Sequence, residues 1–180
     1  MKNVGTQILE TNRIILRRLK DNDAIQMFNN WCNDEEVTKY LSWFPHGDIS
    51  VTKELLSRWI SSYNKNNFYL WGIELKDNHQ LIGTINGFDL KEDSIEIGYC
   101  ISKQYWHKGY TTEALNSITN FFLDICEFPI VYAKHLEENI NSGKVMLKCG
   151  YKHIGNEIIK DKYKNDVKIE VYKIEKTQTN

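Results

Sequence analysis

The segment Tyr105 to Ala114, which reads YWHKGYTTEA, has the residue types and order of an anion-binding turn. Gly109 lets the backbone approach an anion closely. The first free N–H groups of the helix that follows point outward, where the helix dipole favours negative charge. Lys108 adds a cation, and Thr111 and Thr112 add hydroxyl groups. These features predict a pyrophosphate site, although a single glycine between a strand and a helix is also typical of an ordinary turn.

The strand predicted just before this turn, SIEIGYCI, alternates between two kinds of side chain. One face carries Ile95, Ile97, Tyr99 and Ile101, and the other carries Ser94, Glu96, Gly98 and Cys100. The pattern predicts a strand with one apolar face and puts a single carboxylate, Glu96, on the opposite face.

The combined run IEIGYCISKQYWHKGYTTEAL resembles the central segment of GNAT-type N-acetyltransferases, and it is most similar to the RimJ/RimL-like group that acetylates ribosomal-protein N-termini. The superfamily pattern Q/R-x-x-G-x-G/A falls on residues 106–111. His107 stands where glycine is usual, and Thr111 stands where Gly or Ala is usual. The strand LIGTINGFDL, the N-x-x-S motif that begins at Asn139 and the CGY motif that begins at Cys149 also match. The resemblance therefore runs from about Leu9 to Ile174.

This resemblance implies an acetyl-CoA site built between strands that splay apart after Glu96–Ile101. The backbone of Tyr99, Cys100 and Ile101 is expected to bond the pantetheine arm. The pyrophosphate is expected to contact Trp106, His107, Lys108, Gly109, Tyr110, Thr111 and Thr112. Asn139 and Ser142 are expected near the sulfur, although an ordinary helix cap and a solvated helix residue also explain them.

Acetyl transfer to an amine requires a base for the amine proton and a hydrogen-bond donor for the oxyanion that forms from the thioester. The leaving CoA thiolate can take a proton from an acid. Glu96 is the candidate base, and a surface ion pair is the alternative for it. A backbone N–H near Tyr99 is the candidate oxyanion donor. Ser142 is the candidate acid, because Met146 occupies the position where many superfamily members carry a tyrosine. Cys100 and Cys149 lack a Cys-His-acid pattern, so direct transfer in a ternary complex is expected.

The acceptor pocket is expected between the first two helices, the aromatic loop YLSWFPHGD and the sheet. Its candidate lining is Trp31, Tyr40, Trp43, Trp71, Glu74, Phe88 and Asp89. The resemblance favours a protein N-terminal α-amine. Polyamines, amino acids, antibiotics such as aminoglycosides, and a non-catalytic acyl-CoA-binding module stay open as alternatives.

These residues need a mixed α+β scaffold, because hairpin strands come first and a strand-helix pattern follows. The predicted strands span residues 13–19, 68–75, 80–88, 94–101, 130–135, 151–159 and 166–174. The predicted helices span residues 21–32, 109–125 and 139–148, and a further one is capped by Ser50 with Leu55, Leu56, Trp59 and Ile60 as its apolar face. The fold is thus expected to be GNAT-like, with a mostly antiparallel sheet of about six to seven strands and about four helices in a single domain, residues 1–180.

Composition narrows the class of protein further. The chain has 180 residues and a net charge of −1, which does not favour a nucleic-acid binder. The N-terminus lacks the apolar core of a signal peptide, and no apolar run approaches a membrane span, so a cytoplasmic location is expected. The four cysteines and five histidines lack metal-ligand spacing, so no metal is expected. Residues 161–174 predict a sheet edge that allows a homodimer, and Thr177–Asn180 predicts a loose tail.

Overall fold

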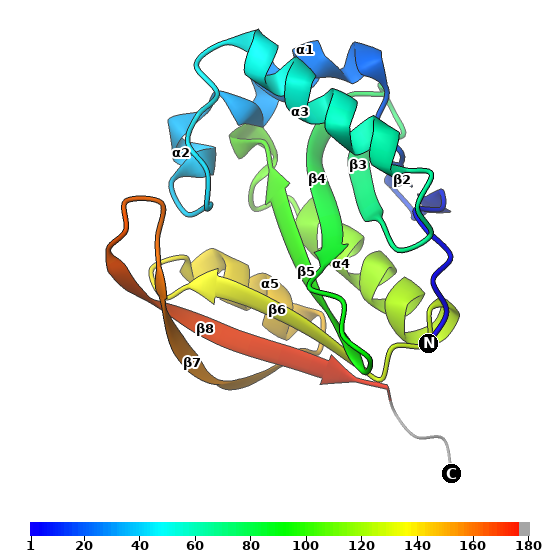
Figure 1. Ribbon diagram of the computed structural model, residues 1–180, viewed down its shortest axis with the longest axis vertical. Helices are drawn as coiled ribbons and strands as arrows, with labels where there is room; N and C mark the ends of the chain where they lie inside the picture. The colour runs from blue at the N-terminus through cyan, green and yellow to red at the C-terminus, as the bar shows by residue number, and fades with distance from the viewer. Residues whose placement is uncertain (177–180) are drawn as a thin grey trace.

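A computed structural model describes residues 1–176 of the protein, so the predicted tail Thr177–Asn180 lies outside the described residues. One sheet of eight strands has the order β1-β2-β3-β4-β5-β6-β8-β7 (Figure 1). All neighbouring strands are antiparallel except β5 and β6, which are parallel. The strands are β1 Leu9–Glu10, β2 Ile14–Arg17, β3 Tyr69–Leu75, β4 Leu81–Phe88, β5 Ser94–Ile101, β6 Ile130–Leu136, β7 Lys152–Lys160 and β8 Asp166–Glu175.

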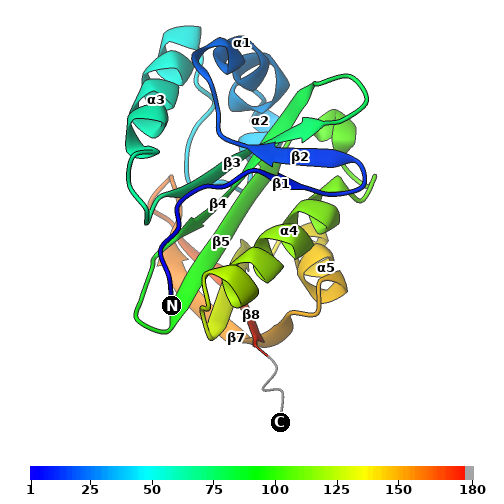
Figure 2. The ribbon, with the colours of Figure 1, turned by 90° about the vertical axis from the view of Figure 1, so that its right-hand side faces the viewer.

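Helices cover both faces of this sheet. Figure 2 shows α3 on one side of the central strands and α4 and α5 on the other side. The α-helices are α1 Ala24–Met27, α2 Glu35–Thr38, α3 Ile49–Ser62, α4 Tyr110–Asn120 and α5 Ile140–Lys148. Short 3-10 or π segments are η1 Asp21–Asp23, η2 Phe28–Cys32, η3 Lys103–Tyr105 and η4 Phe121–Ile125.

Two apolar clusters hold the layers together. The larger cluster packs α4 and the π segment η4 against the sheet, with Leu115, Ile118 and Phe122 fully buried. The smaller cluster packs α1 and α3 on the opposite face, around Met27 and Leu56. Because both faces of the central strands are covered, all seven residues of β3 are buried.

The predicted alternation along β5 is confirmed. Ile95, Ile97 and Ile101 are buried in the larger cluster, and Tyr99 packs against the same cluster. Cys100 instead packs against the smaller cluster on the other face. The strand therefore presents successive side chains to two different layers of helices.

The mixed α+β class is confirmed, and several details differ from the prediction. The two-residue β1 brings the sheet to eight strands, and the four-residue α2 is an additional helix. The predicted helix over residues 21–32 is divided into η1, α1 and η2, and it ends in a π turn where the N–H of Asn33 donates to the carbonyl of Phe28. The cap of α3 is Asp48 rather than Ser50, because the Asp48 carboxylate accepts the Ser50 N–H at 2.8 Å. The predicted edge over residues 161–174 is wrong for β8, which lies between β6 and β7; the edge strands of the sheet are β1 and β7.

A buried ion cluster ties the first helical region to the sheet. Arg17 on β2 makes two hydrogen bonds to Asp23, at 2.8 and 2.9 Å, and a third to Glu74 on β3. His79 bonds the other Glu74 oxygen at 2.8 Å. The Arg17 side chain is only 12% exposed. Glu74 is thus a structural partner of Arg17 and not an acceptor-pocket residue as predicted.

Two further findings concern the described residues as a group. None of the helices within residues 1–176 has the length and apolar character needed to cross a bilayer. The same residues contain no group of three or more His, Cys, Asp or Glu side chains arranged to hold a metal ion.

Candidate functional site

The sheet opens between its two parallel strands. Pairing of β5 with β6 runs from Ser94 opposite Ile130 to Ile97 opposite Ala133. Beyond that point β5 continues to Ile101 and β6 continues to Leu136, so the ends of these strands extend past their paired stretch. A cleft of about 250 Å³ lies in this region.

Most of the residues predicted to bind the cofactor line this one cleft. They are Tyr99, Cys100, Ile101, Trp106, His107, Gly109, Thr111, Thr112, Asn139 and Ser142. Lys108 and Tyr110 lie in the same turn but are not part of the lining. The structure therefore brings together the end of β5, the start of α4 and the start of α5, which are far apart in the sequence.

The turn before α4 has the backbone conformation that an anion cradle needs. Gly109 has a φ of 83° and caps the helix, and His107 has a φ of 60°. Both residues lie in the left-handed region, which costs a non-glycine residue such as His107 about 1–3 kcal/mol. The glycine leaves the first N–H groups of α4 without a side-chain cap. Such strain in a cleft is typical of a binding site.

Arg13, which follows β1, fixes this turn from outside. Its guanidinium donates to the Lys108 carbonyl at 2.9 Å and to the Glu113 carboxylate at 2.7 Å. It also stacks over the Tyr110 ring, with its Cζ atom 4.3 Å from the ring centroid. Burial raises the pKa of Glu113, but the bonds from Thr11 and Arg13 outweigh it and lower that pKa overall. No local sequence pattern distinguishes Arg13, because its partners lie about a hundred residues further along the chain.

The start of α5 presents a hydroxyl pair to the cleft. The Asn139 carboxamide oxygen caps the helix by accepting the Ser142 N–H at 3.4 Å. The Tyr99 hydroxyl lies 2.7 Å from the Ser142 hydroxyl. Asn139 therefore serves as a helix cap, and the same cap sets the position of Ser142 in the cleft.

Trp106 braces the end of β5. Its indole N–H donates to the Ile101 carbonyl at 2.8 Å, and its ring packs against both apolar clusters. Its position explains why a large ring follows the strand. The cleft lining also contains seven residues that were not predicted to contact the cofactor: Val37, Tyr40, Leu41, Asn141, Lys144, Val145 and Lys148.

Glu96 lies where the parallel strands separate. Its carboxylate is 3.3 Å from the ammonium of Lys134, which is the residue that follows the last paired position of β6. Lys134 also pairs with Glu157 at 3.3 Å. Burial raises the pKa of Glu96, and the neighbouring Lys134 opposes that increase. Glu96 does not line the 250 Å³ cleft, so it lies beside the other predicted residues rather than among them.

The two candidate nucleophilic thiols are poorly suited to ionise. Burial raises the pKa of Cys100, whose sulfur lies 3.3 Å from the Thr84 hydroxyl. Burial also raises the pKa of Cys149 to about 11. A thiol reacts as its thiolate, so neither environment favours attack by cysteine.

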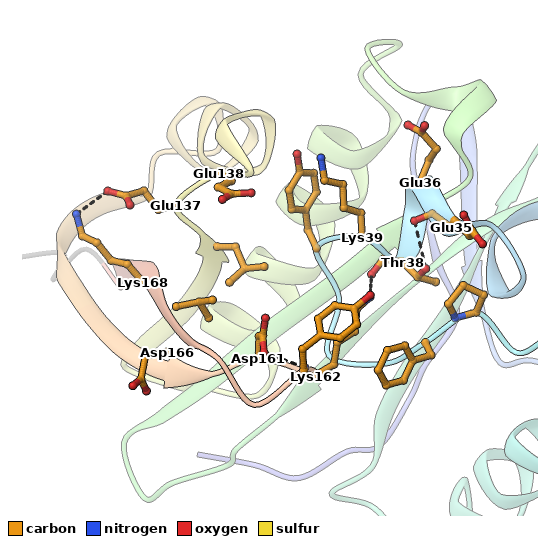
Figure 3. A pocket seen from close by; sticks show the side chains of 16 residues that line it. Glu35, Glu36, Thr38, Lys39, Glu137, Glu138, Asp161, Lys162, Asp166 and Lys168 are labelled. Atoms are coloured by element: carbon orange, nitrogen blue, oxygen red, sulfur yellow. Dashed lines mark hydrogen bonds and ion pairs between the residues drawn. The ribbon is translucent and has the colours of Figure 1, made fainter.

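A second and larger cavity, of about 920 Å³, adjoins the first (Figure 3). Its walls come from α2, the loop after it, the end of β6 and the hairpin between β7 and β8. Its charged residues are the carboxylates Glu35, Glu36, Glu137, Glu138, Asp161 and Asp166 and the lysines Lys39, Lys162 and Lys168. Tyr40 lines both cavities, so it forms the wall between them.

A contact that we call the hairpin latch closes one side of this cavity. Lys162, at the tip of the β7–β8 hairpin, donates to the carbonyls of Thr38 at 2.6 Å and Trp43 at 3.3 Å. The Tyr163 ring meets the Phe44 ring edge to face, with centroids 5.2 Å apart. Burial lowers the pKa of Lys162, against the effect of a nearby aspartate.

Of the residues predicted to contact the acceptor, only Tyr40 lines either of these two cavities. Tyr40 lines both cavities, whereas Trp31 and Trp71 are about 1% and 0% exposed and belong to the core, so they cannot contact an acceptor. Trp43 is half-buried against the α1–α3 cluster, where its carbonyl rather than its ring serves the latch. Phe88 is 40% exposed but lines neither cavity. Asp89, weighed for the same pocket, pairs with a lysine two residues away at 2.9 Å.

Known proteins are similar to this chain in sequence. The family model described as the acetyltransferase (GNAT) domain matches residues 13–152. The uncharacterized N-acetyltransferase YoaA of Bacillus subtilis is 31% identical over 150 residues, which cover 82% of this chain and 84% of YoaA. The uncharacterized N-acetyltransferase p20 of Bacillus licheniformis is 27% identical over 151 residues, which cover 83% of this chain and 84% of p20.

Solved structures show the same fold at low sequence identity. An acetyltransferase of the GNAT family from Bacillus anthracis superposes with a TM-score of 0.84 at 19% identity, covering 94% of this chain and 99% of that one. The ribosomal-protein-S5-alanine acetyltransferase of Vibrio fischeri superposes with a TM-score of 0.82 at 16% identity, covering 97% and 99%.

Proposed function

The chain belongs to the acetyltransferase (GNAT) domain family, and on that premise we propose that it transfers the acetyl group of acetyl-CoA directly to a primary amine. Members of this family are acyltransferases that use acetyl-CoA as cosubstrate. One observation carries the proposal for this chain: the cleft between the separated ends of β5 and β6 meets a left-handed glycine turn at the start of α4.

The residues of the cleft fit acetyl-CoA. The uncapped N–H groups of α4 and the positive end of its dipole suit the pyrophosphate, and Gly109 leaves room for it. The stretch of β5 beyond Ile97 suits the pantetheine arm, whose amides can add to a strand edge as an extended peptide does. When bound, acetyl-CoA supplies an acyl group activated as a thioester.

The proposed chemistry needs few side chains. The acceptor nitrogen bonds to the thioester carbon, the carbon–sulfur bond breaks, and CoA leaves as a thiolate. A free thiol has a pKa near about 8.5, so the thiolate is a good leaving group. The amine proton passes to Glu96 through water, since Glu96 lies outside the cleft lining but at the separation of the strands. Backbone N–H groups near Tyr99 stabilise the oxyanion, and Ser142 faces the sulfur.

Direct transfer is the proposed route because no thiol in the cleft is activated. The raised pKa of Cys100 and of Cys149 disfavours an acetyl-cysteine intermediate. One domain then provides both the cofactor site and the acceptor site.

The acceptor that we propose first is a protein N-terminal α-amine, as in the RimJ/RimL-like group. Support comes from the fold neighbour described as a ribosomal-protein-S5-alanine acetyltransferase. The acceptor would approach from the 920 Å³ cavity, which shares the Tyr40 wall with the cofactor cleft.

The charge of that cavity favours a second candidate, a small polycationic amine such as a polyamine or an aminosugar antibiotic. Six carboxylates line the cavity against three lysines. Three of the carboxylates are paired with lysines: Glu137 with Lys168 at 2.7 Å, Asp166 with Lys160 at 2.7 Å and Glu36 with Lys103 at 3.4 Å. The remaining charged residues of the lining are Glu35, Glu138, Asp161, Lys39 and Lys162. A cationic acceptor would therefore meet a wall in which carboxylates without an ion pair among residues 1–176 outnumber such lysines by one.

The first experiment is a mass-spectrometric assay of acetylated products with N-terminal peptides, spermidine, an aminoglycoside and free amino acids. Product from peptides alone would support the first candidate, and product from spermidine or the aminoglycoside would support the second. Silence across the panel together with measured acetyl-CoA binding would favour a non-catalytic acyl-CoA-binding module.

The role of Glu96 has a matched control in the same ion cluster. We expect Glu96→Gln to lower kcat by about 10²-fold or more and to leave the Kd for acetyl-CoA unchanged, because a general base contributes that much. Glu157→Gln also removes a carboxylate from Lys134, and it should leave kcat unchanged. Equal activity of the two variants would remove Glu96 from the mechanism.

A further inference from the structure

The hydroxyl pair in the cofactor cleft joins two elements that both line the cleft. Tyr99 comes from β5, and Ser142 comes from the first turn of α5. We propose that Tyr99 is a positioning residue that binds the Ser142 hydroxyl and directs its proton at the sulfur of CoA. This inference rests on the proposed function.

The serine is held from two directions. Its N–H donates to the Asn139 cap at 3.4 Å, which fixes the backbone. Its hydroxyl lies 2.7 Å from the Tyr99 hydroxyl, and its carbonyl lies 3.3 Å from the same phenol oxygen. Both side chains line the cleft. A hydroxyl that can rotate freely on a solvated helix is therefore restrained here.

The chemistry of the two hydroxyl groups sets the direction of the hydrogen bond. A phenol has a pKa of about 10 and is a stronger donor than an alkyl alcohol, so Tyr99 donates and Ser142 accepts. Burial raises the pKa of Tyr99, although the bond to Ser142 opposes that increase, so the phenol keeps its proton at neutral pH. The phenol proton has two acceptors on this residue, the Ser142 hydroxyl at 2.7 Å and the Ser142 carbonyl at 3.3 Å, and the hydroxyl is the nearer. With the phenol proton on that shorter contact, the serine proton is free to point at a third atom.

That third atom is the sulfur that becomes negative during transfer. A hydrogen bond to a charged acceptor is about twice as strong as one between neutral groups. The Ser142 hydroxyl therefore stabilises the thiolate as the carbon–sulfur bond breaks, and neither hydroxyl needs to ionise. Tyr99 acts through Ser142 and does not itself touch the sulfur.

The test measures the ionisation of the CoA thiol on the protein, without any acceptor. The absorbance of the thiolate is followed against pH for bound CoA, and the same protein with bound desulfo-CoA provides the reference. In the wild type we expect the thiol pKa to lie below that of free CoA by about one unit, which is the size of one charge-assisted hydrogen bond. In Tyr99→Phe and in Ser142→Ala the thiol pKa should return toward the free value.

A second tyrosine supplies the matched control. The buried Tyr151 hydroxyl bonds the Thr119 hydroxyl at 2.8 Å, and neither residue lines the cleft. Tyr151→Phe removes the same kind of bond elsewhere in the fold, and the thiol pKa in this variant should match the wild type. The double variant of Tyr99 and Ser142 should shift the pKa no further than Ser142→Ala alone, because one hydroxyl acts through the other.

The outcomes separate this inference from the proposed function. CoA that binds to Tyr99→Phe with the wild-type thiol pKa would overturn the role of Tyr99 and leave the acetyltransferase proposal standing. Failure of the wild-type protein to bind CoA would overturn both. Ser142→Ala changes a half-buried helix residue, so it keeps the test decisive if Tyr99→Phe proves unstable.

Discussion

Replacement of Arg13 by Gln is expected to weaken acetyl-CoA binding although Arg13 does not line the cofactor cleft. The change removes the guanidinium bonds to the Lys108 carbonyl and to Glu113, while the backbone N–H of Arg13 still donates to Glu113. The turn then loses the support that holds its carbonyl away from the anion. Gly109 and the first N–H groups of α4 become less preorganised.

The magnitude follows from the two bonds. Hydrogen bonds to charged groups contribute about 1.5–3 kcal/mol each when protected from water. The Arg13 side chain is 41% exposed, so we discount each bond to about 0.5–1 kcal/mol. A total of about 1–2 kcal/mol corresponds to a five- to thirty-fold increase in the Kd for acetyl-CoA if the whole loss falls on the turn.

The control is Arg18, which like Arg13 donates to a backbone carbonyl and lies near a tyrosine ring. Its guanidinium donates to the Thr6 carbonyl at 2.9 Å and lies 5.3 Å from the centroid of the Tyr63 ring, away from the turn. Calorimetric titration of Arg13→Gln and Arg18→Gln with acetyl-CoA should show weakened binding only in the first variant. Equal loss in both, or unchanged affinity in Arg13→Gln, would refute the claim that Arg13 organises the turn.

Three further outcomes concern stability. Gly143→Ala should lower the free energy of unfolding by about 1–3 kcal/mol in denaturant titration, because the new Cβ would lie 2.6 Å from the buried His135 Nε2 atom. An unchanged free energy of unfolding would contradict this. Arg17→Ala should lower the free energy of unfolding by about 3–5 kcal/mol, since it leaves the carboxylates of Asp23 and Glu74 buried without their partner. A loss of stability no larger than that from replacing a surface arginine would contradict this. Burial raises the pKa of Glu74, but its hydrogen bonds outweigh burial and lower that pKa below the ordinary 4.5. The stabilisation that the ionised Glu74 gives to the fold should therefore be complete above pH 4.5 and be lost as the pH falls below that value. Acid unfolding of the wild type without such a loss of stability would contradict this.

The sequence predicted those elements whose patterns are long and local. The bounds of β5 match the predicted strand, because its alternation between isoleucines and small or polar residues is strong. The start of α4 and the cap at Asn139 follow from local glycine and asparagine chemistry. Strand β1 and helix α2 are too short for any periodicity to develop, so they could not be found in this way.

The contacts that organise the site were harder to predict, because they join distant segments. Arg13 lies 95 residues before its partner Lys108, and the Tyr99–Ser142 bond spans 43 residues. No local pattern reports such pairs. The aromatic type of Trp31 and Trp71 suggested a pocket, but residue type does not tell whether a ring faces a cavity or a covering helix.

The two cavities that meet at Tyr40 are built from largely separate parts of the chain. Among the described residues, Tyr40 is the one side chain common to the linings of the two cavities. The 250 Å³ cleft is built on β5, α4 and α5, whereas the 920 Å³ cavity is bounded largely by α2, its following loop and the hairpin that carries Lys162. Substitutions or insertions in that hairpin would therefore reshape the 920 Å³ cavity while leaving the strand and helix starts that line the 250 Å³ cleft unchanged.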